Sequence, residues 1–160
     1  MRESLIASSI SATASGQYIS AAARIIRALK HYKCQTELNL GVLCGSPSGV
    51  VVLDIDVKHD GLSQWNRQAE LHDPFDTFTV RTGGGGLHMY FRYAGAATTL
   101  ETGTNYRYRG WDIRSNMGQV LGPYSIHPTT GAVYQPISGF AEVASVVTPH
   151  FCDMPAWLLE

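Results

Sequence analysis

From residue 39 onward, the chain repeats short apolar runs rich in β-branched residues, each closed by glycine, proline or another turn-forming residue. Runs of this length and composition are typical of β-strands. In this part of the chain, apolar residues at helical spacing occur at 62–71 and in a closing turn at 155–159. The pattern predicts an α+β domain with a mostly antiparallel sheet and flanking helices. The expected strands cover residues 40–44, 50–55, 77–81, 87–93, 106–108, 111–113, 119–121 and 132–134.

The N-terminal part has a different texture. Apolar residues within 17–33 recur at spacings of three and four, as on one face of an amphipathic helix. We expect residues 1–38 to form a small helical segment, a reduced accessory unit, beside a main core at 39–160 within one compact domain. The basic residues of the helix fall largely off its apolar stripe, which indicates either a solvated face or a strip that contacts nucleic-acid phosphate.

Length and composition fit one folded unit. The chain has 160 residues, of which 44% are hydrophobic and 16% charged, so a core can form and long disordered charged tails are not expected. The net charge of −1 is low for a protein that binds nucleic acid alone, because phosphate contacts come from lysine and arginine. Nucleic-acid binding would then be local and weak, or supported by a larger assembly.

The cysteines and apolar runs bear on the cellular compartment. Cys34, Cys44 and Cys152 are widely spaced and include no Cys-x-x-Cys pair, which favours buried free thiols in a reducing compartment. No apolar run approaches the ~20 residues of a membrane span. The first residues also lack the long apolar stretch of a signal peptide. We therefore expect a cytoplasmic protein with no membrane partner.

Two carboxylates end the most apolar run, Val51-Val52-Leu53-Asp54-Ile55-Asp56. Side chains alternate faces along a strand, so Asp54 and Asp56 should point to the same side. Like charges this close repel, and a divalent cation with oxygen ligands would relieve the repulsion. The alternative is a pair of solvated aspartates at a strand end.

A run of four glycines, Gly83 to Gly86, precedes the expected strand at 87–93. Glycines let the backbone turn sharply and approach a ligand closely, and exposed amides in such a loop can hold phosphate. His88 follows on the strand, where an imidazole can contact phosphate or act as a base. The alternative is a flexible hairpin with a buried, hydrogen-bonded histidine. The run is neither a Walker loop nor a Rossmann fingerprint.

A third polar group follows in Gly110-Trp111-Asp112-Ile113-Arg114. Asp112 and Arg114 share a strand face, and Asp112 supplies the third carboxylate that two-metal phosphoryl transfer would use. Arg114 would neutralise phosphate charge or form a salt bridge with Asp112. Ser125 and His127 are likewise two residues apart, further along the chain.

The order of these motifs resembles the archaeo-eukaryotic primase superfamily, and most closely the bifunctional primase-polymerase domain of plasmids, phages and other mobile elements. The resemblance extends from Asn39 to about Leu159. It rests on the aspartate pair, the Gly-Gly-x-His sequence, the Asp-x-Arg sequence and the segment that follows them. These are Val51 to Asp56, Gly85-Gly86-Leu87-His88, Asp112-Ile113-Arg114 and Gly118 to Tyr134.

The resemblance implies an RRM-like catalytic sheet, with a small and atypical N-terminal unit in this chain. It implies a nucleotidyltransferase that acts as a template-directed DNA primase or polymerase in DNA replication, with Mg²⁺ or Mn²⁺. The partners would be a single-stranded DNA template, NTP or dNTP, and a helicase or primer-binding domain on a larger chain or separate protein.

Site roles follow position by position from the same resemblance. The implied metal ligands are Asp54, Asp56 and Asp112, which with His88 form the catalytic set. The implied nucleotide-binding residues are Gly85, Gly86, His88, Arg114, Ser125 and His127. The weakest assignment, template binding, falls on Arg24, Arg27, Lys30, Arg107 and Arg109.

Two alternatives to catalytic nucleotide addition stay open from the sequence. One is a non-catalytic nucleic-acid-binding module derived from such a core, and the other is a metal-dependent nuclease that uses the same carboxylates. Replacing Asp54 and Asp56 with alanine should abolish incorporation while the fold survives or gains stability, since repulsion between the carboxylates is relieved.

Overall fold

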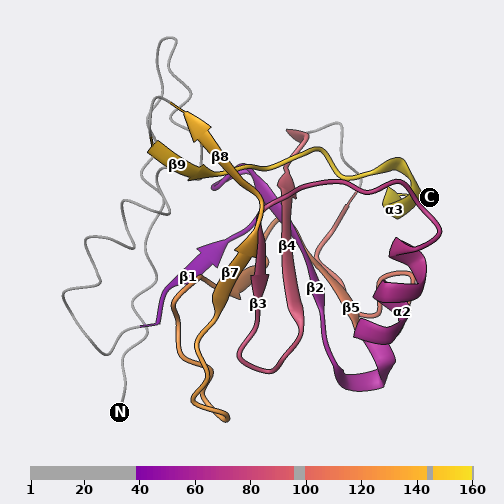
Figure 1. Cartoon of the computed structure of the whole chain (residues 1–160), viewed down its shortest axis with the longest axis horizontal. Coiled ribbons are helices and arrows are strands. Elements are labelled where there is room, and N and C mark those ends of the chain that lie inside the picture. Colours follow the sequence, from indigo (N-terminus) through magenta and orange to yellow (C-terminus); the bar gives the residue numbers. More distant parts are fainter. Residues whose placement is uncertain (1–38, 96–99, 144–145, 160) are drawn as a thin grey trace.

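A computed structural model gives the architecture of the chain (Figure 1). It describes residues 39–95, 100–143 and 146–159. Several sequence predictions fall outside the described residues: the helix at 17–33, the weak template contacts Arg24, Arg27 and Lys30, and Cys34. The division of the chain at residue 38 therefore stays a prediction.

Five strands form the central antiparallel sheet, in the order β5-β2-β4-β3-β7 (Figure 1). The two longest, β2 (Val50–Ile55) and β4 (Leu87–Arg92), pair over their whole length and consist largely of valine and other large apolar residues. Such residues fit a pleated, buried surface. On either side lie β5 (Trp111–Arg114), β3 (Thr79–Arg81) and the edge strand β7 (Gln135–Ser138). The predicted α+β fold with a mostly antiparallel sheet is confirmed.

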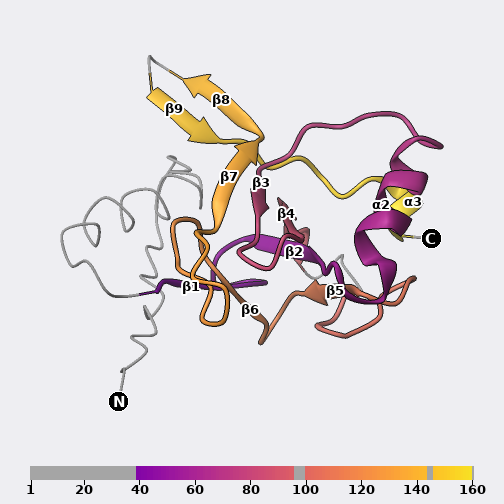
Figure 2. The same cartoon turned by 60° about the horizontal axis from the view of Figure 1, so that its bottom comes forward.

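Two helices cover one face of this sheet, namely α2 (Gly61–Ala69) and α3 (Ala156–Leu159), which lie together in Figure 2. Both agree with the helical spacing in the sequence. Every second residue of β2 points to this side, because side chains alternate along a strand. The helix-face core consists of Val51, Leu53, Ile55, Trp65, Met89, Phe91, Trp111, Ile113, Met154 and Leu158.

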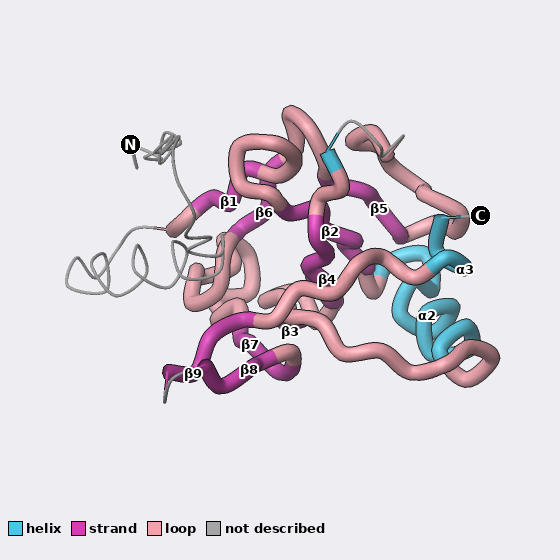
Figure 3. Tube along the Cα trace, turned by 90° about the horizontal axis from the view of Figure 1, so that it is seen from above, coloured by secondary structure: helices cyan, strands magenta, loops and turns pink. Residues whose placement is uncertain are grey.

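The opposite face packs against a ribbon of two short strands, β1 (Gly41–Leu43) and β6 (Gln119–Leu121), visible beside β2 in Figure 3. The ribbon-face core consists of Val42, Cys44, Val50, Val52, Phe78, Val80, Tyr90, Val120 and Tyr134. The alternation that places Val50 and Val52 on this face also places Asp54 there. The face therefore changes from apolar to charged along β2.

Two loops approach each other closely where the chain leaves β2. After Asp56 the chain forms a 3₁₀ turn at Lys58–Asp60 and enters α2 at Gly61. A Cβ on Gly61 would lie 2.3 Å from the Asp56 carbonyl oxygen, so only glycine fits. The indole Nε1 of Trp111 donates to the Gly61 carbonyl at 2.8 Å. These contacts fix the chain where the second aspartate of the motif lies.

Two predicted strands are wrong. Residues 106–108 form a loop in which Arg107 has a φ of 58°, and the flanking Tyr106 and Tyr108 pack against the helix-face core. Their aromatic character reflects this packing. Residues 132–134 instead bond to the 124–127 segment, through Tyr134 N–H to Ser125 O and His127 N–H to Ala132 O. The regular strand begins one residue later.

A hairpin that the sequence analysis did not predict extends beyond β7. Its strands are β8 (Phe140–Val143) and β9 (Val146–Pro149), which pair only with each other (Figure 1). Gly139 allows the sharp turn from β7 into β8, because its φ is +77° and a Cβ there would clash with Thr77. Within the described residues, no helix is long and apolar enough to cross a membrane.

Candidate active site

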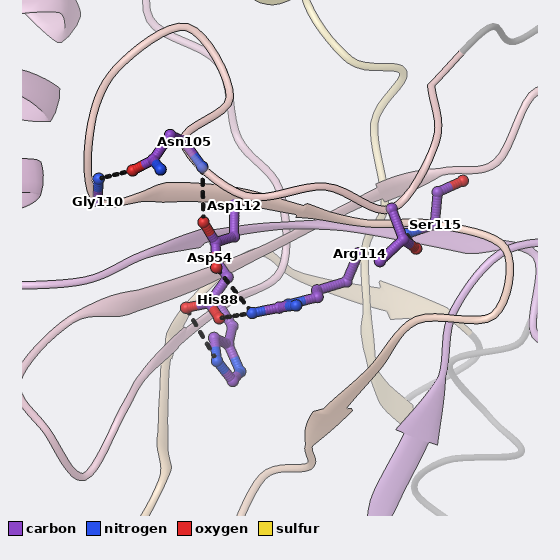
Figure 4. Close-up of polar contacts among 8 residues, drawn as sticks. Asp54, His88, Asn105, Gly110, Asp112, Arg114 and Ser115 are labelled. Carbon is purple, nitrogen blue, oxygen red and sulfur yellow. Dashed lines mark hydrogen bonds and ion pairs between the residues drawn. The ribbon is translucent and has the colours of Figure 1, made fainter.

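Asp54, His88 and Asp112 meet on one face because they occupy paired positions on adjacent strands. Asp54 of β2 lies opposite His88 of β4 on one side and opposite Asp112 of β5 on the other. Directly paired residues of antiparallel strands project to the same side of a sheet. The sheet register thus gathers three residues that lie far apart in the sequence (Figure 4).

The guanidinium of Arg114 lies between the carboxylates of Asp54 and Asp112. Arg114 Nη2 is 2.8 Å from Asp112 Oδ2 and 3.6 Å from Asp54 Oδ2. The remaining oxygens face other partners: Asp54 Oδ1 lies 3.4 Å from His88 Nε2, and Asp112 Oδ1 accepts the Asn105 N–H at 3.0 Å. Every carboxylate oxygen of Asp54 and Asp112 is therefore engaged (Figure 4).

The carboxylate oxygens suit a hard divalent ion, but they are arranged around the guanidinium of Arg114. Carboxylate oxygens are the ligands that Mg²⁺ and Mn²⁺ prefer, and the side chains of Asp54 and Asp112 are each 24% exposed, so solvent reaches them. Among the described residues, no group of three His, Cys, Asp or Glu side chains is arranged to hold a metal ion. An ion that binds both carboxylates must compete with Arg114.

Asp56 lies apart from this contact network. Its Oδ1 accepts the Lys58 N–H at 3.0 Å, and its own N–H donates to the Gly110 carbonyl, which extends the pairing of β2 with β5. The residue is exposed. Burial raises the pKa of Tyr134, and the charges of Asp54 and Asp56 add to that increase, so both carboxylates act on the same ring.

The imidazole of His88 is almost fully enclosed. Its Nδ1 is buried and has no hydrogen-bond partner in the described part of the chain, while its Nε2 faces Asp54. The ring of Tyr134 packs beside it, with centroids 5.5 Å apart. A contact between His88 and a nucleotide phosphate would therefore have to use Nε2, at the expense of Asp54.

The glycine run forms a tight turn between β3 and β4. The N–H groups of Gly85 and Gly86, which the resemblance assigns to the nucleotide, donate instead to the carbonyl and hydroxyl oxygens of Thr82. The backbone N–H groups of Gly83 and Gly84 have no hydrogen-bond partner among the described residues. Gly86 packs against β2, where a Cβ would lie 2.1 Å from the Ile55 carbonyl oxygen.

The loop at 122–134 brings His127 to this turn. A Cβ on Gly83 would lie 2.3 Å from His127 Cβ, and one on Gly84 would lie 3.6 Å from His127 Nε2. Tyr134 stacks against His127 as well, with centroids 6.1 Å apart and planes at 28°. The two imidazoles thus flank one tyrosine, which links the glycine turn to the carboxylates.

Ser125 and the two described template candidates lie elsewhere. The Ser125 hydroxyl is buried, accepts the Leu40 N–H at 3.1 Å and reaches the Leu40 carbonyl at 3.3 Å, so it joins two chain segments. Arg107 and Arg109 are exposed on the loop that also contains Asn105. Arg109 Nη2 lies 3.3 Å from His59 Nδ1. Their predicted roles in nucleotide and template binding stay predictions.

Of the two described cysteines, Cys44 lies nearer the site, and its thiol is buried. Burial raises the pKa of the Cys44 thiol to about 12; Arg114 opposes this and the charge of Asp54 adds to it. At neutral pH the thiol stays protonated, and a protonated thiol is a poor nucleophile and metal ligand. Cys44 and Cys152 are both free thiols, as expected from the sequence.

Asn105, Thr130 and Tyr134 are residues of the site that the sequence analysis did not assign a role. Thr130 stands in a turn sequence, His127-Pro128-Thr129-Thr130-Gly131, which indicates a bend but no partner. Tyr134 was assigned to a strand. Asn105 holds Asp112 through its backbone N–H, a contact that has no sequence signature.

Comparison with protein-family models matches residues 8–157 to the family described as bifunctional DNA primase/polymerase, N-terminal. The match begins within the segment that the sequence suggested as a separate accessory unit. No curated protein and no solved structure matches the chain.

Proposed function

Because the chain belongs to the bifunctional DNA primase/polymerase family, we propose that it joins nucleotides on a DNA template by metal-dependent nucleotidyl transfer. The bond formed links a primer or initiating 3′-hydroxyl to the α-phosphate of an NTP or dNTP. The bond broken joins the α- and β-phosphates, and its cleavage releases pyrophosphate. The protein would then be a template-directed primase or polymerase.

The observation that carries this proposal is the shared position of Asp54, His88 and Asp112. All three lie at paired positions of adjacent strands, on the face that becomes charged next to the glycine turn. Arg114 offsets the repulsion between the two partly exposed carboxylates, but that salt bridge does not explain why His88 and the glycine turn lie beside them. A site for a cation and a polyphosphate explains these features together.

The carboxylates of Asp54 and Asp112 would hold Mg²⁺ or Mn²⁺, with Asp56 as the further ligand that the family resemblance implies. The bound metal would activate the 3′-hydroxyl and neutralise charge on the triphosphate. Arg114, released from the carboxylates, would then face the phosphates. His127 and the amides of Gly83 and Gly84 would bind the far end of the triphosphate.

Template contacts would lie on the loop at 104–110. Arg107 and Arg109 are exposed there, and the same loop reaches Asp112 through Asn105. Exposed arginines next to a phosphoryl-transfer site favour a nucleic-acid backbone, because phosphate contacts dominate non-specific binding. The small number of such residues fits weak, salt-sensitive binding.

The test is an extension assay on single-stranded DNA, with and without a primer, using labelled nucleotides and Mg²⁺ or Mn²⁺. The wild type is compared with Asp112→Asn, which keeps the shape of the side chain and removes its charge. Arg92→Gln serves as a matched control, because Arg92 pairs with Asp153 at an exposed position outside the site. Product from the wild type and the control, but not from Asp112→Asn, would support the proposal.

Other outcomes would select the alternatives. Shortening of labelled DNA in place of extension would indicate a nuclease that uses the same carboxylates. Binding of DNA without metal-dependent addition or removal of nucleotides would indicate a non-catalytic module. Product in the lane without primer would identify a primase, and product only with primer would identify a polymerase.

A further inference from the structure

The turn after His127 determines which ring nitrogen of that histidine carries a proton. The backbone N–H of Thr130 donates to His127 Nδ1, with the two nitrogens 3.2 Å apart. A backbone N–H can only donate, so Nδ1 must accept and is unprotonated. In the neutral imidazole, the proton then resides on Nε2.

The Thr130 hydroxyl connects this histidine to the glycine turn. Its oxygen donates to the Gly83 carbonyl at 2.8 Å, accepts the Ala132 N–H at 3.2 Å and lies 3.1 Å from His127 Nδ1. One hydroxyl therefore contacts the turn that precedes β4, the loop that precedes β7 and the imidazole itself.

The protonated nitrogen points to the glycine turn. A Cβ on Gly84 would lie 3.6 Å from His127 Nε2, at ordinary contact distance. In the described part of the chain Nε2 has no hydrogen-bond partner, and neither do the amides of Gly83 and Gly84. Three donors without a partner among the described residues thus lie on or beside the glycine turn, an arrangement that suits a polyanion.

His88 is a poorer candidate for the same task. Its Nδ1 is buried, and its Nε2 already faces Asp54. His127 is only partly buried and has a free donor. Of the two imidazoles that flank Tyr134, only that of His127 has an Nε2–H free to donate to a phosphate group.

We propose that Thr130 is a positioning residue: its backbone N–H holds His127 as an Nε2–H donor, and its hydroxyl fixes the glycine turn beside the ring, so that both bind the triphosphate of the incoming nucleotide. This inference rests on the proposed function for the identity of the ligand. The placement of the hydroxyl and of the ring proton stands on the contacts alone.

The experiment measures binding of inorganic tripolyphosphate and of dATP with Mg²⁺ by calorimetry, and the protonation of each His127 ring nitrogen by ¹⁵N NMR at mildly alkaline pH. Thr130→Val removes the hydroxyl at constant shape, and Thr130→Ser restores it. His127→Asn keeps an acceptor where Nδ1 lies and removes the Nε2 donor. All four proteins are compared at a temperature at which they are folded.

We expect Thr130→Val to weaken tripolyphosphate binding about fivefold, with Thr130→Ser restoring it, while both variants keep the single Nε2–H signature because their backbone N–H still donates to His127 Nδ1. His127→Asn should keep wild-type thermal stability and lose about tenfold or more in affinity, as for a hydrogen bond to a charged group. A purely structural role of Thr130 would change stability without changing tripolyphosphate affinity below the unfolding transition.

Three results would overturn the inference: a wild type in which Nδ1 carries the proton, a Thr130→Val variant that binds tripolyphosphate as the wild type does, or a wild type that does not bind tripolyphosphate. Failure of the proposed function looks different. The variants would then follow the expected order in polyphosphate binding, while the wild type adds no nucleotide to DNA.

Discussion

At the scale of single residues, Arg114 determines how the carboxylates behave before an ion binds. Its guanidinium contacts both Asp54 and Asp112 and is itself only 28% exposed. Opposite charges at such distances interact by several kcal/mol when partly shielded from water. The arginine therefore stabilises the metal-free site and opposes the ion that would replace it.

Removing this competition should strengthen metal binding. We expect Arg114→Gln to bind Mn²⁺ about tenfold more tightly than the wild type in the absence of nucleotide, because the carboxylates lose their internal cation. Titration of free Mn²⁺ by electron paramagnetic resonance measures the change. Arg92→Gln is the control, since its partner Asp153 lies on the surface, and its Mn²⁺ affinity should not change. Weaker binding by Arg114→Gln would show that the arginine supports the metal.

The same contacts revise the expected stability of aspartate variants. The sequence suggests that removing Asp54 and Asp56 relieves repulsion, but Asp54 lies next to the imidazole of His88 and the guanidinium of Arg114. We now expect Asp54→Ala to lower the free energy of unfolding by about 1 kcal/mol, because a half-buried guanidinium loses a partner. Exposed Asp56→Ala should change it by less than about 0.5 kcal/mol. Urea unfolding separates the two, and an increase for Asp54→Ala would restore the repulsion argument.

At the scale of elements, different glycines of one turn should affect stability and ligand binding. Gly83 and Gly86 lie against His127 Cβ and the Ile55 carbonyl, whereas the nearest atom to a Cβ on Gly84 is at 3.6 Å. We expect Gly83→Ala and Gly86→Ala each to lower the free energy of unfolding by about 2 kcal/mol or more, because neighbouring backbone must move.

Gly84→Ala is the matched variant within the same turn. Its free energy of unfolding should stay within about 0.5 kcal/mol of the wild type, since the methyl group makes only ordinary van der Waals contacts, the nearest with His127 Nε2 at 3.6 Å. The phosphate is proposed to bind at this side of the turn, so the tripolyphosphate affinity of Gly84→Ala should fall. Chemical unfolding and calorimetry on the same preparations check both statements. Equal destabilisation by all three substitutions would mean that the turn tolerates no side chain anywhere.

The elements also show how far the sequence specifies the fold. Strands β2, β4 and β5 were predictable because their apolar residues alternate with polar ones or fill both faces of a central sheet. The loop at 106–108 was not, because aromatic residues that cover a core have the same composition as a strand. Nor was β7, which contains Pro136 and begins only after the 124–134 hairpin has closed.

The candidate site, like the fold, was only partly predictable from the sequence. Two-residue spacing in Asp112-Ile113-Arg114 correctly indicates that the aspartate and the arginine share a strand face, whereas Asp56 lies beyond the end of β2. The spacing does not indicate that Asp54 pairs with both His88 and Asp112, since sheet register depends on contacts distant in sequence. The bond between Thr130 and Gly83 joins two loops, and no local pattern encodes it.

At the scale of the whole molecule, the central sheet separates a core beneath the helices from a core that adjoins the site. Leu158 of α3 is fully buried in the helix-face core. Val120 of β6 is buried in the ribbon-face core, which also contains Cys44, Tyr90 and Tyr134. Tyr134 in turn packs against both imidazoles of the site. The two cores should therefore contribute differently to function.

Truncation in each core tests this separation. Leu158→Ala should lower the free energy of unfolding by about 2–5 kcal/mol, because a buried leucine leaves a cavity, yet leave tripolyphosphate affinity unchanged below the unfolding transition. Val120→Ala removes fewer atoms and should cost about 1–3 kcal/mol, but it loosens the packing around Tyr134 and should weaken tripolyphosphate binding. Thermal unfolding and calorimetry give the two quantities for each variant. If affinity instead fell in proportion to lost stability in both variants, the sheet would transmit changes between its faces, and the phosphate site would depend on the whole molecule.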